Sequence, residues 1–109
     1  MTTKTGTHTV GTRTRDQLKR RLTEIAGRVV AEVRITPALY GGGTVWCAMA
    51  ISPSRQEIPL PGVARDVAAL IQAAFPRADW SLAQDYDTAT GLLSEHVVRI
   101  PACLAGDQR

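Results

Sequence analysis

Apolar residues recur along this chain with two different periods, and the two periods follow one another twice. Residues 14–27 have the three- to four-residue spacing of one helical face. Its apolar positions are Leu18, Leu22, Ile25 and Ala26. Thr14 and Gln17 match a capping box at the start, and Gly27 fits a left-handed cap at the end. The pattern predicts a helix over these residues.

Residues 28–36 and 44–51 alternate with the period of two that is typical of strands. We expect Pro37 to end the first strand and residues 40–43, which contain three glycines, to form the hairpin loop. The set predicted to face the core is Val29, Ala31, Val33 and Ile35 in the first strand, and Val45, Cys47, Met49 and Ile51 in the second.

The same order of elements is predicted again after residues 52–62, a connection that holds three prolines. Residues 63–75 have a helical spacing and are nearly apolar on all sides. Residues 78–86 and 92–100 then alternate as strands around a turn, and Pro101 ends the second of them. Shifting the first half by 49 residues lays each element over its counterpart, which indicates an internal repeat of pattern with few identities.

These elements predict an α+β domain of the order αββαββ. The two hairpins would form a four-stranded antiparallel sheet, with both helices packed on one face. The domain spans residues 14–101, with units 14–51 and 63–100 joined by the connection 52–62. Residues 1–13 are rich in Thr and predict a flexible arm, and residues 102–109 predict an irregular tail.

Composition adds constraints on location and class. The chain has 109 residues, 44% hydrophobic and 21% charged, as expected for one globular domain. It has no apolar run long enough to cross a bilayer and no apolar secretory segment, so we expect a soluble cytoplasmic protein without a membrane partner. Its two cysteines, Cys47 and Cys103, are expected to be reduced. The heavy use of Ala and Arg indicates a bacterial genome rich in G and C.

The sheet face that the helices leave open is the first candidate binding surface. The predicted phase puts the following residues there: Arg28, Val30, Arg34, Trp46, Ala48, Ala50, Ala83, Leu93, Val97 and Arg99. Such a face is too apolar for an indifferent solvent surface. Trp46, with Arg28, Arg34 and Arg99 around it, could pack against the same face of a second copy in a dimer. It could also bind single-stranded nucleic acid, whose bases would stack on Trp46 while the arginines contact phosphate.

Basic residues are concentrated at the start of the chain. Residues 1–34 carry eight basic side chains against three acidic ones, whereas the remainder carries five against seven. The cluster that would contact phosphate is Arg13, Arg15, Lys19, Arg20 and Arg21. Because Arg20 and its neighbours lie opposite the apolar stripe, a solvated helix surface explains them as well.

Catalytic and metal-binding motifs are weaker. His96 and Cys47 fall on matching positions of the two units, which allows a nucleophilic pair, but no third group is placed to orient the His. The segment from Asp85 to His96 fails the calcium-loop pattern, and the glycines at 41–43 lack the Lys-Ser/Thr of a phosphate loop. No cofactor or metal is predicted.

Three hypotheses follow from the sequence. The first is a small non-enzymatic binding or regulatory module that self-associates, as a homodimer, through its open sheet face. The second is a nucleic-acid-binding protein that uses the basic arm and first helix. The third is a small-ligand-binding protein or enzyme with a site near Cys47 and His96.

Overall fold

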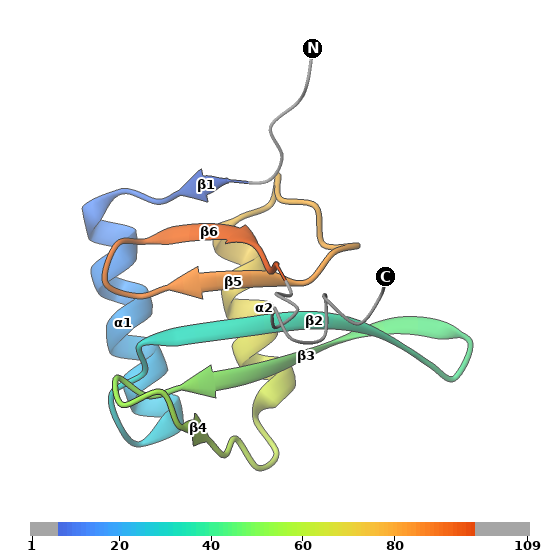
Figure 1. Ribbon diagram of the computed structural model, residues 1–109, viewed down its shortest axis with the longest axis horizontal. Helices are drawn as coiled ribbons and strands as arrows, with labels where there is room; N and C mark the ends of the chain where they lie inside the picture. The colour runs from blue at the N-terminus through green and yellow to red at the C-terminus, as the bar shows by residue number, and fades with distance from the viewer. Residues whose placement is uncertain (1–6, 98–109) are drawn as a thin grey trace, which may run out of the picture.

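Two helices pack against one face of a six-stranded antiparallel sheet (Figure 1). The computed structural model describes residues 7–97. The strands lie in the order β1-β6-β5-β2-β3-β4 across the sheet. The elements, in chain order, are β1 (His8–Thr9), α1 (Thr12–Ala26), β2 (Glu32–Tyr40), β3 (Gly43–Ile51), β4 (Glu57–Ile58), α2 (Ala64–Ala74), β5 (Gln84–Asp87) and β6 (Leu92–Glu95).

The predicted α+β class with two helices and an antiparallel sheet is confirmed, but the prediction of four strands is wrong. The two extra strands are two residues long and come from segments expected to be irregular. β1 belongs to the predicted arm and pairs with β6, and β4 belongs to the Pro-rich connection and pairs with the end of β3. Hydrophobic period cannot reveal a strand of two residues, because two positions define no alternation.

Helix α1 lies close to its predicted place. Leu18 and Leu22 are buried, and Gly27 adopts φ 77° as a left-handed cap whose N–H bonds to the Thr23 carbonyl at 2.8 Å. The capping box at Thr14 is wrong, because the helix begins two residues earlier and its N-cap is Gly11. Thr14 is therefore inside the first turn.

Helix α2 buries Val67, Ala68 and Ile71 against the sheet. Phe75 follows it and packs on Tyr86 of β5, with ring centroids 5.6 Å apart and an interplanar angle of 59°. This tilted contact between the end of α2 and the centre of the sheet is a favourable aromatic geometry.

Strand β2 continues through Pro37 to Tyr40, although Pro37 was predicted to end it. β5 pairs with β2 only as far as Ile35, so beyond that point one edge of β2 has no neighbour among residues 7–97. A proline is tolerated there because no partner requires its missing N–H. Gly41 and Gly42, both with positive φ, then close a two-residue turn.

Strand β5 is shorter than predicted because residues 78–83 make local turns instead. The Ser81 backbone N–H donates to the Asp79 carboxylate at 3.0 Å, and the Leu82 N–H donates to the Asp79 carbonyl at 3.3 Å. Side-chain bonds of this kind compete with a sheet ladder. Residues 1–6 and 98–109 lie outside the described residues, and with them the first six residues of the predicted arm, the end of the strand 92–100 and the tail.

The side of the sheet on which β3 places its residues is opposite to the prediction. In the observed register Ala50 pairs with Val33 and Ala48 with Ile35, and these residues face the helices. Cys47 and Met49 therefore point away from the core, and Met49 is 37% exposed. Both faces of β3 are apolar, so alternation alone does not choose between them.

Val29 was also predicted to face the core and is 52% exposed, whereas Val30 is buried. The cause is the start of β2 at Glu32, four residues later than expected. Val29 and Val30 belong to the bend after α1, where strand alternation does not apply.

Gly91, in the turn between β5 and β6, generates a prediction about stability. It has φ +75°, and an added Cβ would lie 3.2 Å from Cγ2 of Val10. We expect Gly91→Ala to lower the free energy of unfolding by about 2 kcal/mol. Gly27→Ala is the control, since Gly27 has a similar φ and nothing within 4 Å of the added Cβ, so its cost should be about 1 kcal/mol. Denaturant unfolding measures both, and equal losses would contradict the packing argument.

Candidate functional site

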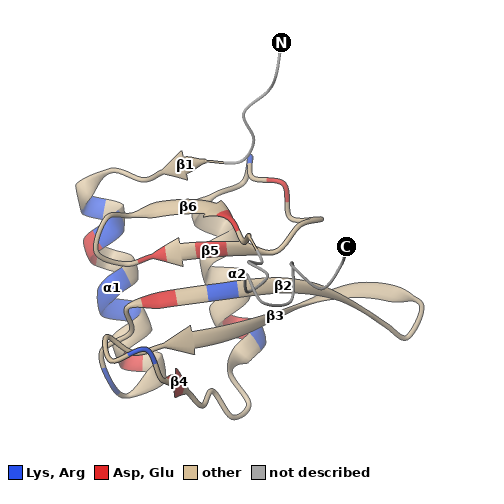
Figure 2. Ribbon diagram, viewed as in Figure 1, with Lys and Arg blue, Asp and Glu red and all other residues tan. Residues whose placement is uncertain are grey.

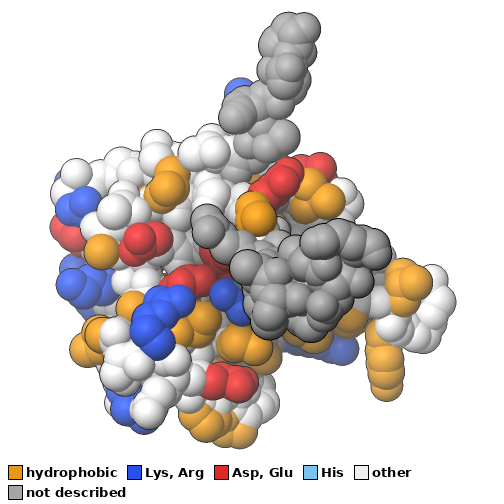
Figure 3. All heavy atoms as spheres, viewed as in Figure 1, with side chains coloured by type: hydrophobic (Ala, Val, Ile, Leu, Met, Phe, Trp, Pro, Cys, Tyr) orange, Lys and Arg blue, Asp and Glu red, His pale blue; other side chains and the backbone are white. Residues whose placement is uncertain are grey.

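The open face of the sheet, turned toward the viewer in Figure 1, divides into a charged half and an uncharged half. Blue and red side chains meet over the middle of the sheet in Figure 3, and orange side chains mark the projecting β2–β3 hairpin at the right. The charged half lies over β2, β5 and the end of β6. The uncharged half belongs to the hairpin.

Arg34 is at the centre of the charged half. Its Nε donates to Oδ1 of Asp85 at 2.9 Å, and its Nη2 lies 3.4 Å from Oε2 of Glu32. Arg55 reaches the other oxygen of Glu32 at 2.9 Å, and Nδ1 of His96 lies 2.8 Å from Oδ2 of Asp85. This network connects the two halves of the sheet, and it occupies the guanidinium of Arg34 with protein carboxylates rather than leaving it for a ligand.

The uncharged half carries a row of side chains on the outer side of β3. We call Val45, Cys47, Met49 and Ile51 the apolar row, of which Ile51 is already buried within the chain, at 7% exposure. Between Arg34 and Arg55 the sequence has no charged residue. The hairpin projects beyond the other strands in Figure 1, and near its tip Tyr40, on the open side, is 71% exposed and Leu39, on the other side, is 86% exposed. Large exposed apolar side chains gathered in one uncharged segment are a recurrent sign of an interaction surface.

Trp46 is not on this face, contrary to the sequence prediction. It packs against the core on the helix side, and its Nε1 donates to the Trp80 carbonyl at 2.6 Å. Trp80 in turn donates from its Nε1 to the Phe75 carbonyl at 3.0 Å. The two indoles thus fasten the base of the hairpin to the turn after α2, which is a structural role for Trp46, the residue that sequence analysis assigned to binding.

The arginines predicted to surround Trp46 do not gather either. Arg28 is exposed in the bend after α1, and Arg34 belongs to the ion-pair network. Arg99 lies outside the described residues. The predicted open-face cluster of one aromatic and three arginines is therefore not assembled among residues 7–97.

The basic cluster lies along α1, where Figure 2 shows several blue bands. Two of its members are engaged: Arg15 approaches Asp16 at 3.8 Å, and Arg21 pairs with Glu24 at 3.1 Å. Arg13, Lys19 and Arg20 are exposed, and none of the three has a carboxylate partner within residues 7–97.

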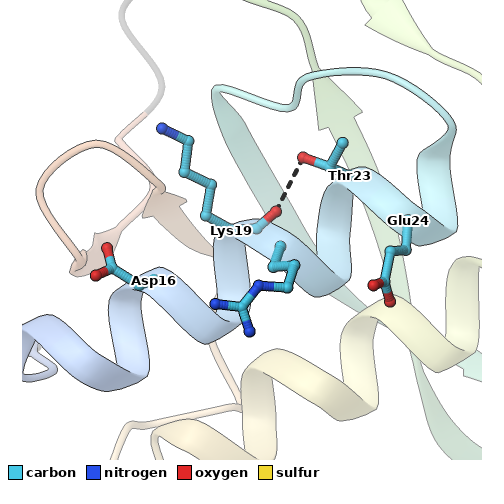
Figure 4. Close-up of a pocket in the computed structure, with 5 residues that line it drawn as sticks. Asp16, Lys19, Thr23 and Glu24 are labelled. Atoms are coloured by element: carbon cyan, nitrogen blue, oxygen red, sulfur yellow. Dashed lines mark hydrogen bonds between the residues drawn. The ribbon is translucent and has the colours of Figure 1, made fainter.

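An open hollow of about 490 Å³ adjoins this part of α1 (Figure 4). It is lined by Asp16, Lys19, Arg20, Thr23 and Glu24, which follow one side of the helix. In Figure 4 the Thr23 hydroxyl bonds to the Lys19 carbonyl, at 2.9 Å, and Asp16 and Glu24 lie toward the two ends of the group. The two carboxylates offset the charges of Lys19 and Arg20, so the hollow has a mixed and not a strongly basic lining.

Cys47 and His96 do not form a nucleophilic pair. Both point to the open face, not to the core as predicted, but β5 and β2 separate the end of β6 from β3. Three strand spacings place the two side chains about 14 Å apart. Within residues 7–97 there is also no group of three or more His, Cys, Asp or Glu side chains arranged to hold a metal ion.

No family model, curated protein or solved structure matches this chain. Neither helix of residues 7–97 has the length and apolarity needed to cross a membrane.

Two buried polar atoms on β5 were not anticipated from the sequence. Oε1 of Gln84 and the hydroxyl of Tyr86 are buried and lack a hydrogen-bond partner in the described part of the chain. Burial raises the pKa of Tyr86 to about 12 because the phenolate would lose its hydration, while the charge of Arg15 acts in the opposite direction. Gln84 still donates from Nε2 to the Asp79 carbonyl at 2.8 Å.

The Tyr86 hydroxyl yields a prediction with a pH dependence. Tyr86→Phe removes a buried, unpaired hydroxyl and with it the cost of its desolvation. At neutral pH we therefore expect the variant to be as stable as the wild type or more stable, by up to about 1 kcal/mol. The unfolded phenol ionises at a lower pH than the folded one. Wild-type stability is therefore lost as pH rises from about 10 toward 12, and the variant should lack this part of the loss. Denaturant unfolding across this pH range measures it, and parallel curves would contradict the assignment.

Proposed function

We propose that this chain is a small binding or regulatory module that self-associates through its open sheet face. The observation that supports this most directly is the apolar row on β3, which lies on the side of the sheet that neither α1 nor α2 covers. Removing apolar surface from water stabilises a complex by about 25 cal/mol per Å². Covering the exposed part of this row with a second surface would therefore favour association.

A second copy of the chain fits such a face for geometric reasons. Two sheets pack face to face at about 10 Å, and a two-fold axis lets the same patch serve both partners. The charged half does not oppose this contact, since its arginines and carboxylates are already paired within one chain and present no excess charge of one sign. The module would meet a further partner, protein or nucleic acid, through the surfaces that remain free.

Met49 offers a test of self-association. A lysine at this position would place an unpaired charge in the middle of the apolar row, so we expect Met49→Lys to weaken the dimer about tenfold or more. Ala69→Lys is the control, because Ala69 is exposed on α2, behind the sheet. Light scattering over a wide concentration range measures both. A wild-type chain that stays monomeric throughout would overturn the proposal.

Nucleic-acid binding through α1 is the second candidate. The observation in its favour is that Arg13, Lys19 and Arg20 are exposed on one helix without carboxylate partners among residues 7–97. Three such groups would contact phosphate and make the affinity fall as salt rises, because bound counterions are released.

The test of this candidate is a pair of charge reversals on the two helices. We expect Lys19→Glu with Arg20→Glu to abolish retention on immobilised DNA, since two phosphate contacts become repulsive. Arg65→Glu with Arg77→Glu makes the same change of charge at exposed positions on and just after α2 and should leave most of the retention. Equal losses in the two variants, or retention that does not depend on salt, would contradict a specific role for α1.

A further inference from the structure

The outer edge of β3 is the longest part of the sheet that has no neighbouring strand among residues 7–97. β3 spans Gly43–Ile51, and β4 pairs only with Ala50 and Ile51. Residues 43–49 therefore present their outward N–H and C=O groups without a strand to receive them. The other end of the sheet is closed by β1, which is only two residues long.

Prolines explain why β4 covers so little of this edge. Ile58 is opposite Ala50, so the same register continued by one residue would place Pro59 opposite Met49. Two residues further, Pro61 would be opposite Cys47. A proline has no N–H to donate to a ladder, so pairing stops after Ile58 and the chain turns toward α2.

This edge also lacks the usual protection against pairing. Natural edge strands are protected by charged side chains, prolines or bulges, or are very short. Residues 43–49 contain neither a charge nor a proline, and all seven belong to a regular strand. An extended backbone can replace water along a row of N–H and C=O groups of this spacing, so a β-strand is the occupant that the edge fits.

We propose that the occupant is the same edge of a second copy, paired antiparallel around a two-fold axis near Val45 and Trp46. The two sheets then form one continuous sheet. This inference rests on the proposed self-association but gives it a different contact, because the edge of β3 takes the place of the face-to-face packing considered above. The two arrangements are alternatives, and the variants below distinguish them.

Self-pairing follows from the composition of the strand. Two identical strands in antiparallel orientation put the same residues in symmetric positions, and without charges no like-charged pair arises. On the open side Val45 and Cys47 of one copy meet the same residues of the other. On the helix side a hollow of about 240 Å³ beside Trp46, bounded by Arg65, Ala68 and Gln72 of α2, leaves room for a side chain of the partner strand.

Two lysine substitutions distinguish the edge from the face. Cys47 and Thr36 are directly paired on β3 and β2 and share the open face, but only Cys47 borders the edge. We expect Cys47→Lys to raise the dimer dissociation constant about tenfold or more, because it puts symmetric charges into the strand pair. Thr36→Lys should change it by less than about threefold. Equal losses in both variants would show face packing, which overturns the edge pairing and leaves self-association standing.

A disulfide trap tests the geometry itself. Residues directly opposite in an antiparallel pair have Cβ atoms about 5 Å apart, close enough for a disulfide with small adjustment. In a Cys103→Ser background, Val45→Cys should form a reducible covalent dimer. The link joins the two introduced thiols, or one introduced thiol and the native Cys47 of the other copy. Ala69→Cys, at an exposed position of α2 behind the sheet, should give no covalent dimer in the same background.

The outcomes separate the two proposals. A covalent dimer for Val45→Cys alone supports edge pairing. A non-covalent dimer that fails to cross-link at residue 45 overturns edge pairing but not self-association, and a monomer at every concentration overturns both. Circular dichroism of each variant checks that the fold is retained.

Discussion

Four residue pairs between β2 and β5 hold the two helix–strand–strand units in one sheet. On the helix side Val33 lies beside Tyr86 and Ile35 beside Gln84, and on the open side Arg34 binds Asp85. Hairpins and single helices of this size are marginal alone, so each unit depends on the other for a core. This short junction therefore determines where the helices pack and which strands remain at the periphery.

The unequal lengths of the two central strands explain the shape of the candidate site. β2 has nine residues and β5 has four, so five residues of β2 extend beyond their neighbour and take β3 with them. The projecting hairpin is fastened at its base by the bond from Trp46 to the Trp80 carbonyl. Its free edges are thus consequences of one mismatch in strand length, together with the prolines that shorten β4.

Periodicity in the sequence was sufficient for the coarse architecture but not for the site. Both helices and the central hairpin lie within a few residues of their predicted positions, because Leu18, Leu22, Val67 and Ile71 mark unambiguous helical faces. The orientation of β3 could not be predicted, since Trp46, Ala48 and Ala50 on one side are as apolar as Val45, Cys47 and Met49 on the other. That choice depends on which side α2 approaches and on the distant carbonyl that Trp46 reaches.

The same limitation affected the ion-pair network. Arg34 and Asp85 are 51 positions apart, and only the register between β2 and β5 brings them together. Turn chemistry was visible in principle, because Asp79 and Ser81 have the spacing of a local side-chain bond that competes with a strand. The prediction of a strand over residues 78–86 relied on the alternation of apolar residues and overlooked this local bond.

The uncharged hairpin also has a consequence for how the chain is made and kept soluble in a cell. Residues 45–51, Val-Trp-Cys-Ala-Met-Ala-Ile, form a seven-residue window of high β-propensity without charge, proline or glycine. Such windows are the segments from which aggregation starts. During synthesis this window leaves the ribosome before α2, the helix that packs against one of its sides. The nearest charged residues that could oppose its self-association are then Arg34 and Arg55, which flank it in the sequence. Chains that are synthesised side by side on one messenger RNA would associate first through this segment.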